Sequence, residues 1–143
     1  HVDGSNIEKL TASDFYNDNP RWSPDGEWIA YDAWSIATIR LMRADGTEDH
    51  NIPNLPIRQY SYGPQWSPDS QWIAFSAGEH YEDDDIYRIH PDGTGLQQLT
   101  RSPIAEWPIG WSPTTDLAWS GWQLGLGGLV LLAMAGFWGY RSL

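Results

Sequence analysis

The sequence predicts an all-β fold made of repeated four-stranded sheets, followed by one apolar α-helix. The string Trp-Ser-Pro starts at Trp22, Trp66 and Trp111, so it recurs after 44 and 45 residues. Repetition at a fixed interval of this length indicates a repeat architecture. Between the copies, Asp-Gly turn signals separate short runs rich in Ile, Ala and aromatic residues, which is the pattern of β-strands. Near the C-terminus, a long uncharged stretch is typical of a membrane-spanning helix.

The first complete unit covers residues 19–53 and contains four predicted strands. The first strand ends at Trp22, the second is 28–31, the third is 39–43 ahead of an Asp-Gly turn, and the fourth follows that turn. The second unit covers residues 63–100 and repeats this order. We expect the cores of the units to hold their repeated tryptophans, which are Trp22, Trp66, Trp111, Trp28 and Trp72.

Two incomplete units flank these. Residues 1–11 are predicted to be the last strand of an earlier unit, and residues 108–119 the start of a degraded third unit whose second strand is 117–119. Four strands in a period of about 40–45 residues make a propeller blade, so we expect a partial β-propeller of about 2.5–3 blades. Because a propeller closes with about four to eight blades, either upstream blades belong to the native protein or partners cover the exposed edges.

The repeated strings carry a family resemblance. Residues 20–31 read Pro-Arg-Trp-Ser-Pro-Asp-Gly-Glu-Trp-Ile-Ala-Tyr, and residues 86–93 read Ile-Tyr-Arg-Ile-His-Pro-Asp-Gly ahead of a closing Leu-Thr. Over residues 1–119 the chain resembles the TolB-type (WD-like) β-propeller repeat. This resemblance implies a bacterial periplasmic or surface protein.

The run from Gly121 to Tyr140 predicts a transmembrane helix within residues 120–143. It has no charge and one strongly polar residue, Gln123, and twenty residues at a helical rise of about 1.5 Å span a bilayer core of about 30 Å. Arg141 follows the run, so the positive-inside rule places a short tail in the cytoplasm and the blades in the periplasm or outside the cell. Aromatic residues suited to the two membrane interfaces are Trp119, Trp122, Trp138 and Tyr140.

Two other interpretations of this run stay open, namely a buried helix of a soluble core and a sorting signal that a peptidase removes. The run has no polar face, and no Leu-Pro-x-Thr-Gly or Pro-Glu-Pro element precedes it. We favour a permanent single-pass anchor. A stripe of small residues would let another membrane helix approach closely, although glycine is also simply frequent in membrane helices; the stripe consists of Gly121, Gly125, Gly128, Ala135 and Gly139.

Composition argues against several classes of function. The formal net charge of −11 disfavours nucleic acid as a partner. No cysteine is present, no Gly-x-Ser-x-Gly element occurs, and the four histidines lack metal-ligand spacing. The sequence therefore predicts no catalytic residue, no metal site and no cofactor, and we expect a protein that is not an enzyme.

An acidic run lies in the predicted loop between the second and third strands of the second blade. Its carboxylates are Glu82, Asp83, Asp84 and Asp85. Calcium is an unlikely ligand because the EF-hand order of ligands is absent, and a solvated loop is the plainer interpretation. The run could instead dock a basic partner, since loops on a rigid scaffold often carry binding residues. Three aromatic residues that we expect to be partly exposed could also contact a partner, namely Trp34, Tyr60 and Trp107. Packing between blades explains these three aromatic residues equally well.

The function expected from these features is a non-enzymatic, membrane-anchored, extracytoplasmic protein-binding module. It would serve as an accessory or scaffolding subunit of a larger membrane complex, with the helix docked among other membrane subunits. The alternative is a surface-anchored sensor or ligand-binding propeller whose upstream blades are missing from this chain. A third hypothesis is a fragment of a propeller that accompanies a peptidase domain.

Overall fold

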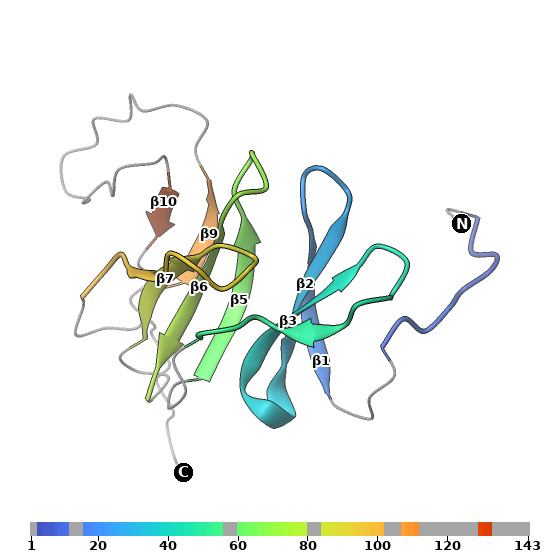
Figure 1. Ribbon diagram of the computed structural model, residues 1–143, viewed down its shortest axis with the longest axis horizontal. Helices are drawn as coiled ribbons and strands as arrows, with labels where there is room; N and C mark the ends of the chain where they lie inside the picture. The colour runs from blue at the N-terminus through green and yellow to red at the C-terminus, as the bar shows by residue number, and fades with distance from the viewer. Residues whose placement is uncertain are drawn as a thin grey trace, which may run out of the picture.

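A computed structural model of the chain describes residues 3–11, 16–55, 60–79, 84–101, 107–111 and 129–132. These residues form two four-stranded antiparallel sheets and one two-stranded sheet (Figure 1). The strands of each four-stranded sheet follow one another in chain order. The prediction of an all-β fold with four-stranded blades is confirmed.

The first blade contains β1 (Asn17–Trp22), β2 (Trp28–Ala33), β3 (Thr38–Arg43) and β4 (His50–Asn51), and a short 3-10 helix, η1 (Trp34–Ile36), joins β2 to β3. The Pro-Asp-Gly segment closes the turn from β1 to β2. There the Gly26 N–H donates to the Ser23 carbonyl at 2.9 Å, and the Ser23 hydroxyl accepts from the Trp28 N–H at 2.9 Å. Gly26 has φ +76°, a conformation that favours glycine.

The second blade contains β5 (Tyr60–Trp66), β6 (Ile73–Gly78), β7 (Asp85–Ile89) and β8 (Gln97–Gln98). In both blades the first strand is bulged at the residue before a proline, which is Asn19 in β1 and Gly63 in β5. Both residues have positive φ. The first strands begin at residues 17 and 60, slightly ahead of the predicted unit limits at 19 and 63.

The third sheet pairs β9 (Trp107–Trp111) with β10 (Leu129–Leu132). The prediction of one continuous helix through the apolar run is therefore wrong for these four residues. Leu129 pairs with Trp111 just as Ile29 pairs with Trp22 and Ile73 with Trp66, so β10 takes the second-strand position of a third blade.

Leu129–Leu132 forms a strand because the backbone N–H and C=O groups of β9 need hydrogen-bond partners. An apolar segment that contains a β-branched residue can pair with β9 and supply them. The second strand expected at 117–119 and the rest of the apolar run lie outside the described residues. In the part of the chain that the structure describes, no helix is long and apolar enough to cross a membrane.

The N-terminal residues 3–11 contain no strand, where the sequence predicts the last strand of an earlier blade. A strand needs a neighbouring strand for its hydrogen bonds, and no strand of an earlier blade exists among the described residues. Leu10 instead lies beside the turn at Gly46 of the first blade.

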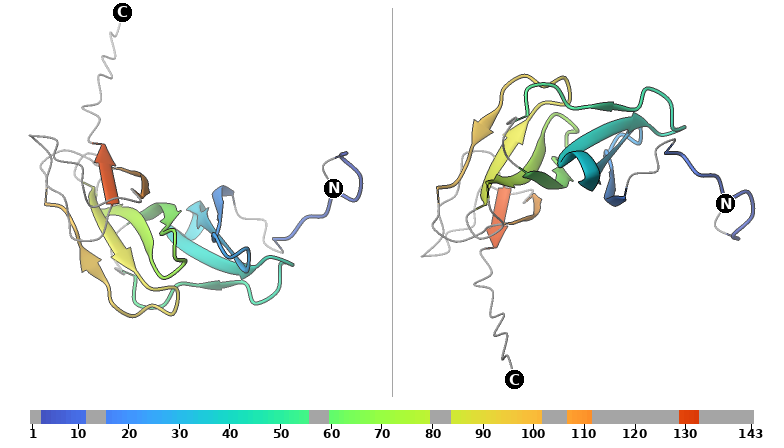
Figure 2. Two further views of the ribbon diagram at one scale, coloured as in Figure 1. Left: turned by 90° about the horizontal axis from the view of Figure 1, so that it is seen from above. Right: turned by 90° about the horizontal axis from the view of Figure 1, so that it is seen from below.

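The main core lies between the two complete blades, which pack side by side (Figure 2). We call the side of a blade that faces the preceding one its front face, and the opposite side its back face. The first blade's back face and the second blade's front face interlock through ten buried residues, which are Ala30, Ile39, Leu41, Ile52, Leu55, Trp66, Ile73, Phe75, Ala77 and Ile89. The back face of the second blade packs in turn on Trp111 of β9.

The repeated tryptophans are not equivalent in the structure. Trp66 is buried at 8% exposure and Trp111 is half-buried, whereas Trp22 is 57% exposed. The prediction of a core position is wrong for Trp22, because no blade among the described residues packs against its front face. Trp28 and Trp72 are half-buried rather than fully enclosed.

Candidate functional site

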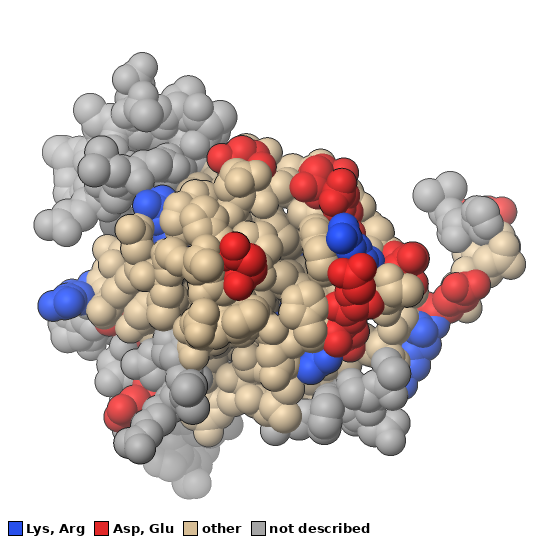
Figure 3. Space-filling model, viewed as in Figure 1, with Lys and Arg blue, Asp and Glu red and all other residues tan. Residues whose placement is uncertain are grey.

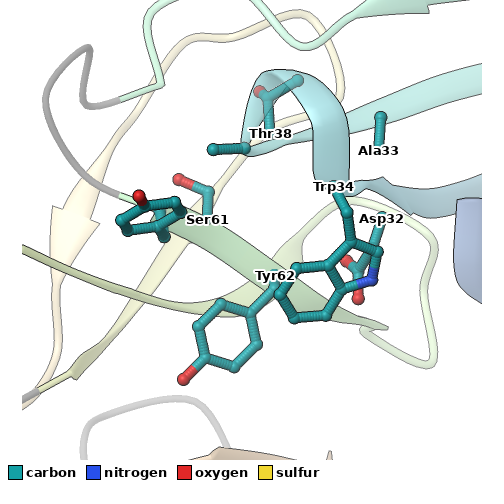
Figure 4. A pocket seen from close by; sticks show the side chains of 8 residues that line it. Asp32, Ala33, Trp34, Thr38, Ser61 and Tyr62 are labelled. Carbon is teal, nitrogen blue, oxygen red and sulfur yellow. The ribbon is translucent and has the colours of Figure 1, made fainter. Parts of the chain in front are cut away.

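A small pocket lies between the two complete blades, at the end where β2 runs into η1 and β5 begins (Figure 4). It is a shallow depression in the surface, without enclosed space for a water molecule. We call it the interblade pocket. The first blade contributes Asp32, Ala33, Trp34, Ala37 and Thr38, and the second contributes Tyr60, Ser61 and Tyr62.

Local backbone geometry fixes the first-blade wall of this pocket. The Trp34 N–H donates to the Tyr16 carbonyl at 3.1 Å, which holds the start of η1. Ala37 then reverses the chain in the left-handed conformation, with φ 51°. Its carbonyl accepts from the Ser61 N–H at 3.3 Å, so the two blades are joined by a backbone hydrogen bond beside the pocket.

Aromatic side chains from both blades meet at the pocket. The half-buried Trp34 indole stacks on the Tyr62 ring, with centroids 5.9 Å apart and planes inclined by 23°. The Tyr62 hydroxyl donates to the buried Asp84 carboxylate. Tyr60, which is 43% exposed, lies at the entrance from the second blade. The stacking and the hydrogen bond hold two of these rings in place.

Asp32 is the buried charged group of the pocket, with 1% exposure. One carboxylate oxygen accepts from the Asn19 side-chain amide at 2.7 Å, and the other accepts from the Gly63 N–H at 2.9 Å. Burial raises the pKa of Asp32 to about 6, and the hydrogen bonds from Asn19 and Gly63 oppose that rise. This carboxyl therefore titrates near the lower end of the physiological pH range.

The Asp32 arrangement is not repeated at the next junction. The residue equivalent to Asp32 in the second blade is Ser76, and the residue equivalent to Gly63 in β9 is Pro108, which has no N–H to donate. The carboxylate acceptor and the backbone N–H donor are therefore both absent at the next junction. The carboxylate–amide pair belongs to the junction that forms the interblade pocket.

Three ion pairs lie on the first blade, among the residues that the structure describes. Figure 3 shows the acidic side chains of this face gathered mainly over the first blade, with basic side chains among them. Arg40 bonds Asp49 at 2.9 Å, and Arg43 bonds Glu27 at 3.2 Å and Glu48 at 3.5 Å. The two exposed pairs of Arg43 contribute little stability. Within the described residues, no group of three or more possible ligands is arranged to hold a metal ion.

The structure brings together some of the site residues predicted from the sequence and separates others. Trp34 and Tyr60 both line the interblade pocket, and Asp84 is linked to it through Tyr62. Asp85 begins β7 and accepts from the Gln98 side chain at 2.6 Å, toward the outer edge of the second blade. Trp107 begins β9 at the position equivalent to Tyr62, but its side chain, Glu82, Asp83 and the small-residue stripe lie outside the described residues.

Sequence reasoning missed Asp32 and Tyr62. The sequence did contain a signal for Asp32. The second strands of the two units align, and the first has an acidic residue, Asp32, where the second has Ser76. Tyr62 gave no signal, because its role depends on contacts with Trp34 in η1 and with Asp84 just before β7, which are distant in the sequence.

Comparisons with known proteins show which solved structures have a similar fold. No protein-family model matches the sequence, and a search of curated proteins finds no match. Among solved structures, TolB from Acinetobacter baumannii superimposes with a TM-score of 0.62 at 21% identity, over 78% of this chain and 28% of that chain. A putative TolB from Agrobacterium tumefaciens gives 0.58 at 25% identity, over 71% of this chain and 36% of that one.

A third structure, of a nidogen–laminin complex, matches with a TM-score of 0.55 at 16% identity, over 72% of this chain and 38% of that chain. These similarities support a TolB-like β-propeller fold. The chain spans between 28% and 38% of the length of the three solved chains.

Proposed function

We propose that this chain is a non-enzymatic protein-binding module of the bacterial cell envelope, which contacts its partner around the interblade pocket. The observation that carries the proposal is the pair Trp34 and Tyr60, which come from two different blades and line one pocket. Trp and Tyr are the residues most enriched at the energetic centres of protein interfaces. Fold alone does not decide between binding and catalysis, so the proposal rests on this site.

The negative net charge of the chain indicates which kind of protein partner it would attract. A formal net charge of −11 favours a basic protein surface, which long-range attraction would bring toward the blades. Asp84 holds the Tyr62 hydroxyl, and the Tyr62 ring stacks on Trp34, so binding requires little reordering of the pocket wall. Association should therefore weaken as the salt concentration rises.

The test is affinity purification of the tagged chain from membranes of its host, with co-purifying proteins quantified by mass spectrometry. Tyr60→Ala should reduce the recovery of specific partners about thirtyfold, the loss expected for an interface hot spot of about 2 kcal/mol. Leu96→Ala is the matched control, because Leu96 is exposed to a similar degree, at 38% against 43%, but lies outside the pocket. Equal recovery with both variants would contradict the proposal.

The finer proposal is that residues 120–143 anchor the module in a membrane, where it serves as an accessory or scaffolding subunit of a larger complex. The uncharged run with aromatic residues at both ends supports this. Strand β10 opposes it, because Leu129–Leu132 cannot pair with β9 and span a bilayer at once. Retention of the chain in the membrane pellet after alkaline carbonate extraction would support the anchor, and release would contradict it.

A second candidate function is ligand sensing by a larger propeller, for which this chain supplies part of the pocket. A buried carboxyl, Asp32, beside aromatic side chains favours it. Further blades would have to supply the space for the ligand, because the pocket in this chain is too small to hold one. This candidate predicts a longer native polypeptide and a small ligand that changes Trp34 fluorescence. A native mass near 16.2 kDa with stoichiometric protein partners would instead favour the binding module.

A further inference from the structure

Asp32 is a buried acid whose hydrogen-bond donors carry no charge. It lines the interblade pocket (Figure 4), with 1% of its surface exposed. Its carboxylate accepts from the side-chain amide of Asn19 at 2.7 Å and from the backbone N–H of Gly63 at 2.9 Å. Among the residues that the structure describes, Asp32 forms no ion pair. Burial of an ionised carboxylate without a bonded cation is costly, so these surroundings favour the uptake of a proton.

The two donors come from equivalent positions of the two blades. Asn19 and Gly63 are the bulge residues of β1 and β5, with φ 48° and 68°. Glycine and asparagine adopt this conformation more readily than most residues, but they offer different groups to Asp32. Gly63 offers a backbone N–H, which can only donate. Asn19 offers a side-chain amide, whose nitrogen donates and whose oxygen accepts.

Protonation changes the partners that the Asp32 carboxyl requires. The ionised form accepts at both oxygens, whereas the protonated form accepts at one oxygen and donates from the other. Because the Gly63 N–H can only donate, the oxygen bonded to it has to remain an acceptor, and the proton belongs on the oxygen that faces Asn19. A half-turn of the Asn19 amide about its last side-chain bond replaces its NH₂ group with its carbonyl oxygen, which accepts the new O–H.

Few charged groups act on Asp32. Burial has the largest influence and raises the pKa of Asp32 to about 6; its two hydrogen bonds and Arg21 of β1 oppose this rise, and Asp18 of β1 adds to it. The sequences of β5, β6 and η1 contain no charged residue, and β3 places Ile39 opposite Asp32. The tyrosines of β5 ionise only at alkaline pH. Asp32 is therefore the group of this junction that changes its charge between pH 5 and pH 8.

We infer that Asp32 and Asn19 form a proton-operated switch in the wall of the interblade pocket. As the pH falls, Asp32 takes up a proton from water, the Asn19 amide turns over to accept the new O–H, and the Gly63 N–H keeps its bond. The pocket wall changes from one negative charge to none, while the two blades stay docked. The inference goes beyond the proposed function and stands independently of it, because the switch needs no partner.

NMR spectroscopy of the full chain, labelled with ¹³C and ¹⁵N and held in mild detergent, tests the inference directly. At pH 8 we expect scalar couplings through the hydrogen bonds from Asp32 Cγ to Asn19 Nδ2 and to the Gly63 backbone nitrogen. At pH 5 the coupling to Asn19 should be lost and the coupling to Gly63 retained. The Asp32 carboxyl and Asn19 amide shifts should titrate together. Persistence of both couplings, loss of both, or a carboxyl that does not titrate between pH 5 and pH 8 would each overturn the inference.

The variant Asp32→Asn supplies the second readout. Its amide offers a carbonyl oxygen to the Gly63 N–H and an NH₂ group to Asn19, as the protonated carboxyl does. The Asn19 amide resonances of the variant should therefore be independent of pH and match those of the wild type at pH 5. Asn54 is the matched control, because its amide donates to the Gly93 carbonyl at 3.0 Å, which does not titrate. Variant resonances that match the wild type at pH 8, or an Asn54 shift as large as that of Asn19, would refute the inference.

Discussion

The carboxyl of Asp32 should make the stability of this protein depend on pH in a direction opposite to that of most carboxylates. Its pKa is raised to about 6 by burial, against an ordinary value of 3.8. Between these two values the folded state holds more protons on Asp32 than the unfolded state does. The contribution of this group to stability is therefore fully present below about pH 4 and is lost as the pH rises through about 6.

The size of the effect follows from the shift. About two pH units correspond to about 3 kcal/mol over the full titration, of which roughly 1.4 kcal/mol falls between pH 5 and pH 8. Replacing Asp32 with Asn removes the titration but keeps an oxygen that can accept from the Gly63 N–H. Relative to Asp32→Asn, the wild type should therefore lose about 1.4 kcal/mol of unfolding free energy as the pH rises from 5 to 8.

Urea denaturation of the two proteins at pH 5, 6, 7 and 8 gives this difference, and starting at pH 5 avoids precipitation near the isoelectric point of about 4.4. Asp25→Asn is the matched control. Hydrogen bonds from Ser23 and Glu27 hold the pKa of Asp25 below its ordinary value, so Asp25 stays ionised throughout this range. A difference between wild type and Asp32→Asn that stays constant with pH would refute the reasoning, as would a ¹³C carboxyl resonance of Asp32 that titrates near pH 4.

Three further substitutions test contacts within the second blade and between the two blades, each by urea denaturation. Trp66→Phe should lower the unfolding free energy by about 2 kcal/mol, because it removes the indole N–H bonded to the Arg21 carbonyl and leaves space in the core. Tyr62→Phe should cost about 1–3 kcal/mol, since buried Asp84 loses a hydroxyl donor. Gly93→Ala should cost about 2 kcal/mol or more, because Gly93 has φ +81° and a Cβ would lie 2.5 Å from the Pro53 carbonyl oxygen.

Each of these has an outcome that contradicts it. Gly26→Ala is the control for Gly93→Ala, since Gly26 has φ +76° but nothing within 4 Å of a Cβ, so it should cost only about 1 kcal/mol. Equal losses at the two glycines would show that the contact with Pro53 is unimportant. An unchanged midpoint for Trp66→Phe or for Tyr62→Phe would show that the hydrogen bond concerned contributes nothing net.

The strands and their order within each blade could be predicted from the sequence, because they depend on local chemistry. The Pro-Asp-Gly turn before Trp28 is closed by side chains that lie within a few residues of it, and the same residues recur at the second turn. The repeat interval then fixed the four-stranded unit. The residues Trp34 and Tyr60 could be singled out as candidates, but nothing local indicated that they share one pocket.

Tertiary structure alone decided burial and pairing. Trp22 and Trp66 have the same local sequence, yet one is exposed and the other buried, because burial depends on whether a neighbouring blade packs on the strand. Leu129–Leu132 reads as part of a helix in sequence, yet it forms β10, because the unpaired backbone of β9 is available to it. The raised pKa of Asp32 likewise arises from its burial at the junction with the second blade, which contributes the Gly63 N–H from 31 residues away along the chain.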